Sequence, residues 1–171
     1  ELNKLAVVEA GMTLTGLNAD ERLRLKPGLQ FSLIRVLINE LIKTNGIDKS
    51  KVDPGLNKFF SGLTIDEFAA QNSLDKNKIK QLADDVKSSR GKSIVYGGDI
   101  LPSETHMLIN LLNELLGNEV NYDFENSFIQ NRAVSSSDEI KDLVDGLNKN
   151  RIGAVIHLES NPVYELAPGL K

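Results

Sequence analysis

The distribution of apolar and polar residues along the chain predicts three short buried strands. Each is an apolar, β-rich run that stops at small or turn-forming residues: 5–9 (LAVVE), 93–96 (SIVY) and 153–158 (GAVIHL). None alternates regularly with polar residues, which is typical of strands covered on both faces of a parallel sheet. A weaker run at 120–124 is a further candidate, whereas the glycine-punctuated stretch at 11–28 predicts an irregular connection.

A repeat of apolar residues every three to four positions predicts amphipathic helices between these strands. The expected helices cover approximately residues 28–43, 64–71, 75–89, 103–116 and 136–147. The first has a polar side that includes Asn39, so one apolar face should pack against a large element. Thr64 with Glu67, and Ser136 with Glu139, have the spacing of capping boxes, in which side chains bond the free N–H groups of a helix start.

Strands without alternation, separated by amphipathic helices, predict an α/β fold. We expect a Rossmann-like, doubly wound, mostly parallel sheet with helices on both faces. Residues 1–171 then form a single α/β domain. The polar, turn-rich stretch at about 45–62 is interpreted as an insert or long loop.

Composition excludes several classes of function. The 171 residues carry a net charge of −4 with both signs interspersed, which gives no support for nucleic-acid binding. There is no cysteine, so these residues form no disulfide, cysteine-ligated zinc site or iron–sulfur cluster. No apolar run approaches the ~18 residues of a membrane span, so we expect no direct membrane insertion. The sequence opens inside an expected strand without a visible signal peptide, and is interpreted as a fragment of a larger protein.

In doubly wound sheets, ligands bind outside the carboxyl ends of the strands. After the strand at 93–96, Gly97 and Gly98 leave room for a phosphate, and Asp99 can accept hydrogen bonds from a base or ribose. The next helix offers free N–H groups there. In the alternative interpretation, the glycines only turn the chain and Ser103 only caps the helix. The pattern is neither GxGxxG nor a P-loop.

Two further places carry candidate chemistry. Ser160-Asn161-Pro162 follows the strand at 153–158, where an asparagine can read a nucleotide base edge or merely stabilise a turn. His106 lies in the first turn of a helix, where a cation is unfavourable, and is expected to be neutral. His157 lies within a presumed buried strand and is interpreted as a core histidine. The two histidines lack metal-ligand spacing, and we predict neither catalytic residues nor metal ligands.

Three segments resemble the molybdopterin oxidoreductase superfamily, in the same order. They are KLAVVEAGMTLTGLNADERLRLKPG, DKNKIKQLADDVKSSRGKSIVYGGDILPSETHMLINLLNELLGN and IGAVIHLESNPVY. The resemblance covers most of the chain except the stretch around 45–62. The branch that it resembles is the iron–sulfur/molybdopterin-like subunit of alternative complex III, a membrane-associated quinol:electron-acceptor oxidoreductase of bacterial respiration.

This resemblance implies an oxidoreductase parent whose molybdopterin-like domain has lost its molybdenum cofactor. Iron–sulfur clusters would lie in a later part of the parent chain. The implied partners are the rest of that polypeptide, haem-c subunits and a quinol-binding membrane subunit, with the domain on the periplasmic side. Matched by position, the loop Gly97, Gly98 and Asp99 and the turn Ser160, Asn161 and Pro162 are vestigial candidates. The turn contacts the guanine part of molybdopterin guanine dinucleotide in active relatives.

Glu159 departs from the family pattern, because relatives commonly have glycine there. A negative charge ~4 Å from a pyrophosphate costs on the order of 4 kcal/mol at an effective dielectric constant near 20. We therefore expect no cofactor in this fragment, which is interpreted as a non-catalytic scaffold domain. Two alternatives remain open. One is the cofactor-binding domain of an active molybdopterin-dependent oxidoreductase, with Glu159 pointing away; the other is an unrelated nucleotide- or sugar-phosphate-binding module.

Overall fold

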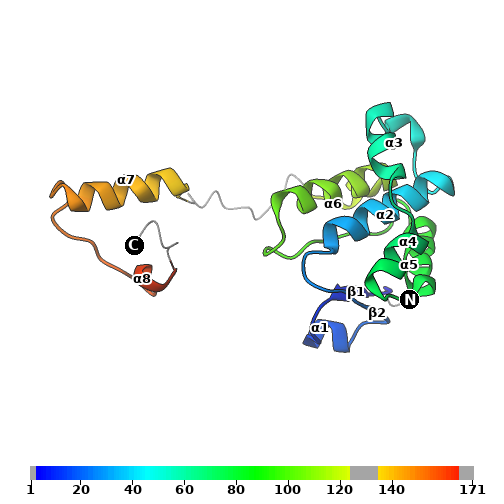
Figure 1. Cartoon of the computed structure of the whole chain (residues 1–171), viewed down its shortest axis with the longest axis horizontal. Helices are drawn as coiled ribbons and strands as arrows, with labels where there is room; N and C mark the ends of the chain where they lie inside the picture. The colour runs from blue at the N-terminus through cyan, green and yellow to red at the C-terminus, as the bar shows by residue number, and fades with distance from the viewer. Residues whose placement is uncertain (1–2, 124–134, 166–171) are drawn as a thin grey trace. The chain divides into compact units, whose positions relative to one another are not determined.

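A computed structural model describes residues 3–123 and 135–165, and the chain divides into two compact units, Glu1–Glu125 and Asn126–Lys171. The strands and α-helices of the first unit, labelled in Figure 1, are β1 (Ala6–Glu9), α1 (Leu14–Leu17), β2 (Glu21–Arg24), α2 (Gln30–Lys43), α3 (Pro54–Ser61), α4 (Ile65–Asn72), α5 (Lys76–Ser88) and α6 (Ser103–Leu116). The same unit contains two short 3-10 helices, η1 (Lys49–Lys51) and η2 (Asn118–Asn121). The second unit contains α7 (Ser137–Asn148) and α8 (Pro162–Glu165).

The predicted doubly wound sheet is wrong. Within the described ranges, the sheet consists of β1 and β2 alone, which pair in parallel with Ala6 opposite Glu21 and Glu9 opposite Arg24. All of the other elements in the described ranges are helices. A Rossmann-like sheet with helices on both faces is therefore absent from the described part of the chain.

The other predicted strands fail for different physical reasons. Residues 93–96 belong to no strand, and the side-chain amide of Asn113 pairs with both backbone groups of Val95 where a neighbouring strand was expected. Residues 153–158 are exposed throughout, whereas a strand inside a parallel sheet must be covered on both faces. His157 is correspondingly exposed and is not a core histidine. The weak run at 120–124 begins within η2, and its last residue lies outside the described residues.

Two elements of the stretch at 11–28 were not predicted from the sequence. The stretch expected to be irregular contains the single-turn helix α1 and the strand β2. The signal for β2 was present, because charged residues alternate with Leu23 and Leu25 and both leucines are buried.

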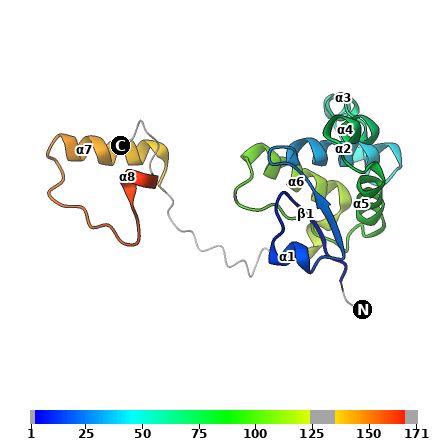
Figure 2. The same cartoon turned by 60° about the horizontal axis from the view of Figure 1, so that its bottom comes forward.

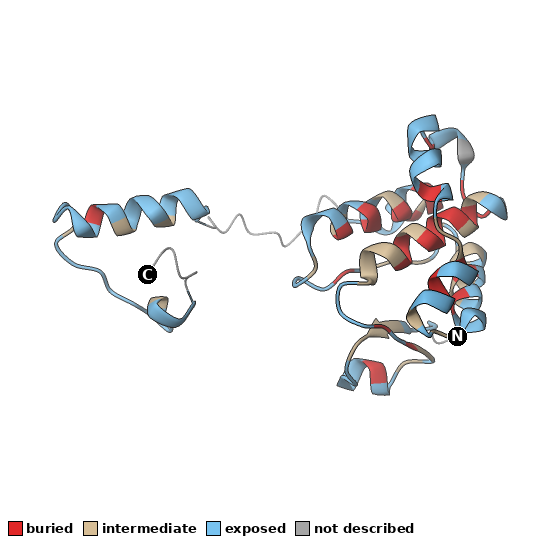
Figure 3. Ribbon diagram, in the orientation of Figure 1, coloured by how far each residue is buried: buried red, intermediate tan, exposed pale blue. Residues whose placement is uncertain are grey.

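Helix α2 is the centre of the first unit and contacts α3, α4, α5 and α6 (Figures 1 and 2). One cluster of buried residues joins α2 to α3 and α6: Ile34, Ile38, Leu41, Ile47, Val52, Phe60, Leu108, Ile109, Leu112, Leu115 and Leu116. A second joins it to β2, α4 and α5: Leu23, Leu25, Leu33, Val36, Leu37, Ile65, Phe68, Ala69, Ile79 and Ala83. Buried positions therefore follow α2 and α6 along most of their length (Figure 3).

The polar side of α2 is also used in packing, which the prediction of one apolar face did not anticipate. Asn39 is 3% exposed, and its side chain donates a hydrogen bond to the Leu63 carbonyl at 2.8 Å. Arg35 donates from Nε to the Phe59 carbonyl at 2.8 Å, and its guanidinium carbon lies 4.5 Å from the centre of the Phe59 ring. These contacts anchor α3 and the start of α4.

The five predicted helices are confirmed as α2, α4, α5, α6 and α7. Both capping boxes are confirmed as well. Thr64 Oγ1 accepts from the Glu67 N–H at 3.2 Å, and the Glu67 carboxylate accepts from the Thr64 N–H at 2.9 Å; Ser136 and Glu139 form the same pair of bonds. The stretch at 45–62 contains η1 and α3 and contributes Phe60 to the core.

In the second unit, Ile152 folds back over α7. The Arg151 N–H donates to the Gly146 carbonyl at 2.9 Å, and a Cβ on Gly146 would lie 2.9 Å from Ile152 Cδ1. The glycine therefore allows this close approach. Across the described ranges 3–123 and 135–165, no helix combines the length and apolar character needed to cross a membrane.

Candidate functional site

Gly97 is required by packing. It is buried, and a Cβ on this residue would lie 2.5 Å from Ile109 Cδ1, 3.1 Å from Leu101 Cδ1 and 3.3 Å from His106 Cε1. The space beside its Cα is therefore filled by side chains of the same unit. Gly98 differs, because no atom would lie within 4 Å of its Cβ. The room expected for a phosphate exists at Gly98 but not at Gly97.

The neighbouring groups make few polar contacts. Asp99 is exposed, and its carboxylate accepts a hydrogen bond from the Tyr96 hydroxyl at 3.4 Å. Helix α6 follows with Pro102 at the N-cap and no side-chain capping bond, so Ser103 does not cap the helix, as the alternative interpretation had assumed. Ser103 is instead the first helical residue, and the Thr105 N–H reaches the Pro102 carbonyl at 2.9 Å.

The second predicted group opens a short helix. Asn161 Oδ1 accepts from the Tyr164 N–H at 3.3 Å, and the Glu165 carboxylate accepts from the Asn161 N–H at 3.2 Å. Pro162 is the first residue of α8, a position where its missing N–H costs nothing. Ser160 precedes this cap and is exposed. The Asn161 side chain thus acts locally as a helix cap.

Glu159 has a backbone conformation that favours glycine. Its φ is +49°, in the left-handed region that non-glycine residues rarely adopt. A glycine at this position would adopt the same conformation without strain.

The two predicted groups belong to different units. Gly97, Gly98 and Asp99 are in the first unit, and the turn at 160–162 is in the second. Both groups were expected at the carboxyl ends of parallel strands, at 93–96 and 153–158. Neither segment is a strand, so this expectation does not hold for either group.

The end of β1 carries a polar cluster that the sequence interpretation missed. The Glu9 carboxylate accepts hydrogen bonds from Arg22 Nε at 2.6 Å, Thr13 Oγ1 at 2.7 Å and the Thr13 N–H at 3.3 Å. Arg22 also donates to the Gly11 carbonyl at 2.9 Å. The Glu9 side chain is only 10% exposed. The bonds from Arg22 and Thr13 hold the pKa of Glu9 below its ordinary value.

Gly16 completes this arrangement, which we call the Glu9 cluster (Glu9, Thr13, Gly16 and Arg22). Its N–H donates to Thr13 Oγ1 at 3.0 Å, and a Cβ at this position would overlap the Glu9 carboxylate. The donors that the loop after β1 offers to an anion are therefore taken by a carboxylate of the same chain. The sequence signal was a glutamate that ends a buried strand, followed by a glycine-rich loop and an arginine in an alternating run.

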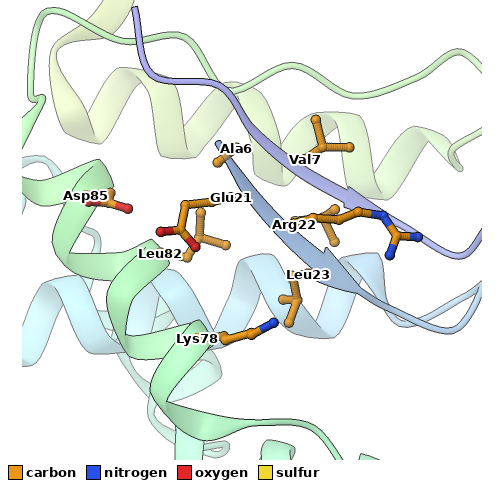
Figure 4. A pocket seen from close by; sticks show the side chains of 9 residues that line it. Ala6, Val7, Glu21, Arg22, Leu23, Lys78, Leu82 and Asp85 are labelled. Carbon is orange, nitrogen blue, oxygen red and sulfur yellow. The ribbon is translucent and has the colours of Figure 1, made fainter. Parts of the chain in front are cut away.

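A small hollow lies between the two strands and α5 (Figure 4). Its lining residues are Ala6, Val7, Val8, Glu21, Arg22, Leu23, Lys78, Leu82 and Asp85. Its volume of about 10 Å³ is room for roughly one water molecule. This hollow is too small for a nucleotide or a molybdopterin.

An ion-pair network lies beside the hollow. Lys4 Nζ lies 2.7 Å from the Asp85 carboxylate and 3.5 Å from that of Glu21. The hydrogen bond to Asp85 is the main cause of the raised pKa of Lys4. The Gln81 side chain also donates to Glu21 at 2.5 Å. These contacts join the strands to α5, which indicates a structural role.

The predicted strand ends do not fit molybdopterin guanine dinucleotide. Side chains fill the space beside Gly97, the Glu9 carboxylate takes the donors after β1, and Asn161 caps α8. Among the residues that the structure describes, no group of three or more histidine, aspartate or glutamate side chains can hold a metal ion. No protein-family model matches the chain, and no curated protein matches it.

Proposed function

We propose that this chain is a non-catalytic scaffold domain within an electron-transfer subunit of a respiratory quinol:electron-acceptor oxidoreductase, of the alternative complex III type. The support for this parentage is the resemblance of three segments, in the same order, over most of the chain. The left-handed backbone at Glu159, where the family motif has glycine, agrees with that resemblance. The predicted sheet gives no support, because it is not found in the described residues.

One observation carries the non-catalytic part of the proposal. The Glu9 carboxylate, 2.6 Å from Arg22 Nε and 2.7 Å from Thr13 Oγ1, occupies the donors that follow β1. An anionic cofactor would have to displace this internal ion pair and leave a poorly exposed carboxylate without its partners. The arrangement favours a loop that is stabilised by contacts within the chain over a loop that forms a pyrophosphate-binding site.

Cofactor binding is the direct test. We expect the purified 171-residue chain to show no saturable binding of molybdopterin guanine dinucleotide by calorimetry. Tight, stoichiometric binding would contradict the scaffold interpretation and favour the active molybdopterin-dependent alternative.

Two variants, Glu159→Gly and Glu159→Gln, separate the effect of the Glu159 charge from that of its backbone conformation. If both variants bind molybdopterin guanine dinucleotide and the wild type does not, the negative charge of Glu159 prevents cofactor binding. If the wild type binds the cofactor and neither substitution changes its affinity, the active molybdopterin-dependent interpretation is supported.

The third interpretation is tested by a thermal-shift panel of nucleotides and sugar phosphates. A ligand at 100 times its dissociation constant stabilises a protein by about 2.7 kcal/mol, which is a measurable shift. We expect no member of the panel to reach this shift. A clear shift with one nucleotide would identify a nucleotide-binding module instead.

The parentage requires a separate experiment in the native host. We expect a chromosomally tagged version to purify from solubilised membranes with c-type haem absorbance and iron–sulfur electron paramagnetic resonance signals. Protease added from the periplasmic side should reach the tag. Purification without either redox signal would contradict the assignment to a respiratory complex, whatever the outcome of the cofactor test.

A further inference from the structure

We propose that Arg22 and Thr13 form a binding site for a small carboxylate, which the free chain fills with its own Glu9. We call the three donors of this site, Arg22 Nε, Thr13 Oγ1 and the Thr13 N–H, the carboxylate site. Glu9 acts there as an internal competitor, so a carboxylate from solution binds only where the Glu9 side chain is displaced or removed. The inference rests on contacts within the first unit and does not depend on the proposed function.

The structure shows which chemical group these donors hold. One oxygen of the Glu9 carboxylate accepts from Arg22 Nε at 2.6 Å, and the other accepts from Thr13 Oγ1 at 2.7 Å. The Thr13 backbone nitrogen lies 3.3 Å from both oxygens. Hydrogen bonds to an ionised group are stronger than those between neutral groups. The Glu9 side chain is 10% exposed, so water competes little for these bonds.

Contacts that do not involve Glu9 hold the Arg22 side chain. Its Nη2 donates to the Gly11 carbonyl at 2.9 Å. The pairing of the strands fixes its backbone, because Arg22 of β2 lies opposite Val7 of β1. The guanidinium should therefore stay in place when the Glu9 carboxylate leaves.

Thr13 is held in the same independent way. Its Oγ1 accepts from the Gly16 N–H at 3.0 Å, and its carbonyl accepts from the Leu17 N–H at 2.9 Å. Gly16 also leaves the space that the carboxylate fills, since a Cβ there would overlap Glu9. Donors and space are thus positioned before a ligand arrives, which lowers the free-energy cost of binding.

The number of donors favours a carboxylate over a phosphate. Three donors contact the two oxygens of Glu9, and no other donor of the described residues reaches them. A phosphate has further oxygens that need donors after it loses its water. In the carboxylate site, those oxygens would have none. The expected ligand is therefore a small monocarboxylate with the dimensions of the Glu9 side-chain end.

The neighbouring loop gives access to this site, and the tether of Glu9 limits its use. Gly11, Met12 and Thr13 are exposed, so the site lies beside solvent. Glu9 is part of the same chain and competes at an effective concentration of at least about millimolar. Because of this competition, the wild type should bind a free carboxylate far more weakly than a variant without Glu9.

Acetate binding to the full 171-residue chain tests this inference. Glu9→Ala removes the internal carboxylate and leaves the donors. We expect acetate to bind this variant saturably with a millimolar dissociation constant, at least about tenfold more tightly than the wild type. Two-dimensional NMR measures the affinity, and the largest shifts should be those of the Arg22 Nε–H, the Thr13 amide and the Gly16 amide. Sodium chloride at equal ionic strength controls for general salt effects.

Three further variants locate the binding. Glu9→Gln keeps a side chain of the same size in the site, so acetate should not bind. Adding Arg22→Gln to Glu9→Ala removes the guanidinium and should weaken acetate binding at least about tenfold. Glu21→Ala is the matched control, because it removes a carboxylate from the ion-pair network of Lys4 and should not create acetate binding.

Two measurements complete the test. If Glu9→Ala is partly unfolded, acetate but not chloride should restore its circular dichroism spectrum, because a ligand of the folded state stabilises that state. N-acetyl-aspartyl amide represents an acidic side chain of a partner protein. It should bind Glu9→Ala more weakly than acetate, since the site is poorly exposed and the amide groups are bulky.

Any of four results would overturn the inference. Glu9→Ala that shows no saturable response to acetate would mean that the donors do not form a site. Equal affinity with and without Arg22→Gln would place the binding elsewhere. Phosphate that binds more tightly than acetate would contradict the predicted ligand class. Tighter binding of N-acetyl-aspartyl amide than of acetate would assign the site to a partner's side chain instead of a free carboxylate.

Discussion

The side-chain amide of Asn113 holds the backbone of Val95 through two hydrogen bonds, one at 2.9 Å from the Val95 N–H and one at 2.8 Å to its carbonyl. Asn113 lies on α6 and is 2% exposed. Asn118 Nδ2 donates to the same Asn113 oxygen at 3.2 Å, which fixes the orientation of the amide. A single helical residue therefore attaches an extended segment to the core.

Loss of this amide should destabilise the first unit. Asn113→Ala leaves the partly buried N–H and C=O of Val95 without partners, and we expect it to lower the free energy of unfolding by about 1–3 kcal/mol. Urea denaturation followed by circular dichroism measures the change. Asn110→Ala is the matched control, because Asn110 is exposed on the same helix. An equal effect of the two substitutions would show that the Asn113 pairing contributes nothing.

The Glu9 cluster predicts a difference between two glycines that lie between β1 and β2, Gly11 in the loop and Gly16 in α1. Gly16→Ala introduces a Cβ that overlaps the Glu9 carboxylate, so the ion pair with Arg22 must shift. We expect a loss of about 1–3 kcal/mol in the free energy of unfolding. A Cβ on Gly11 would meet no atom within 4 Å, so Gly11→Ala should change stability by less than about 0.5 kcal/mol. Thermal unfolding of both variants gives the comparison, and similar melting temperatures would contradict it.

The lowered pKa of Glu9 predicts that part of the stability depends on acidity. Hydrogen bonds from Arg22 and Thr13 hold the folded-state pKa below the ordinary glutamate value of 4.5. The contribution of ionised Glu9 to the free energy of unfolding is therefore complete above pH 4.5 and is lost as the pH falls through the folded-state pKa. Glu9→Gln should be less stable than the wild type at neutral pH, and this difference should shrink in acid.

Urea denaturation between neutral pH and about pH 3 measures this dependence. Glu114→Gln is the control, since Glu114 is exposed on α6 and its side chain forms no hydrogen bond with the described residues. Its unfolding curve should follow that of the wild type at every pH. A difference between Glu9→Gln and the wild type that stays constant with pH would contradict the assigned ion pair.

The helices were predictable because their signals are local. Apolar spacing along α5 and α6 and the capping boxes at Thr64 and Ser136 depend on residues within about one helical turn of each other. The sheet was not predictable in the same way. A short apolar run such as residues 93–96 has the same composition whether its neighbour is a strand or a row of asparagine side chains.

The candidate site shows the same difference between local signals, which the sequence contains, and packing contacts, which it does not. The glycine pattern at 97–98 indicated a place where side chains must be absent, and at Gly97 the structure explains that absence by Ile109, Leu101 and His106. These residues follow Gly97 in the next loop and on α6, and the Gly-Gly-Asp pattern itself does not indicate that they pack against it. The ion pair between Glu9 and Arg22 could not be predicted either, because the residues around Glu9 indicate only a glutamate at the end of a strand.

The sequence by itself determined approximately where α2, α4, α5, α6 and α7 lie, because caps and apolar periodicity act over a few residues. It also determined the absence of cysteine chemistry in these residues. Only the tertiary structure decided what lies beside each strand-like segment. Asn113 takes the inner side of Val95, and β2 takes one side of β1. Such pairings satisfy backbone groups through residues that are distant in sequence. Backbone N–H and C=O groups are alike at every residue except proline, so the local sequence does not specify their partners.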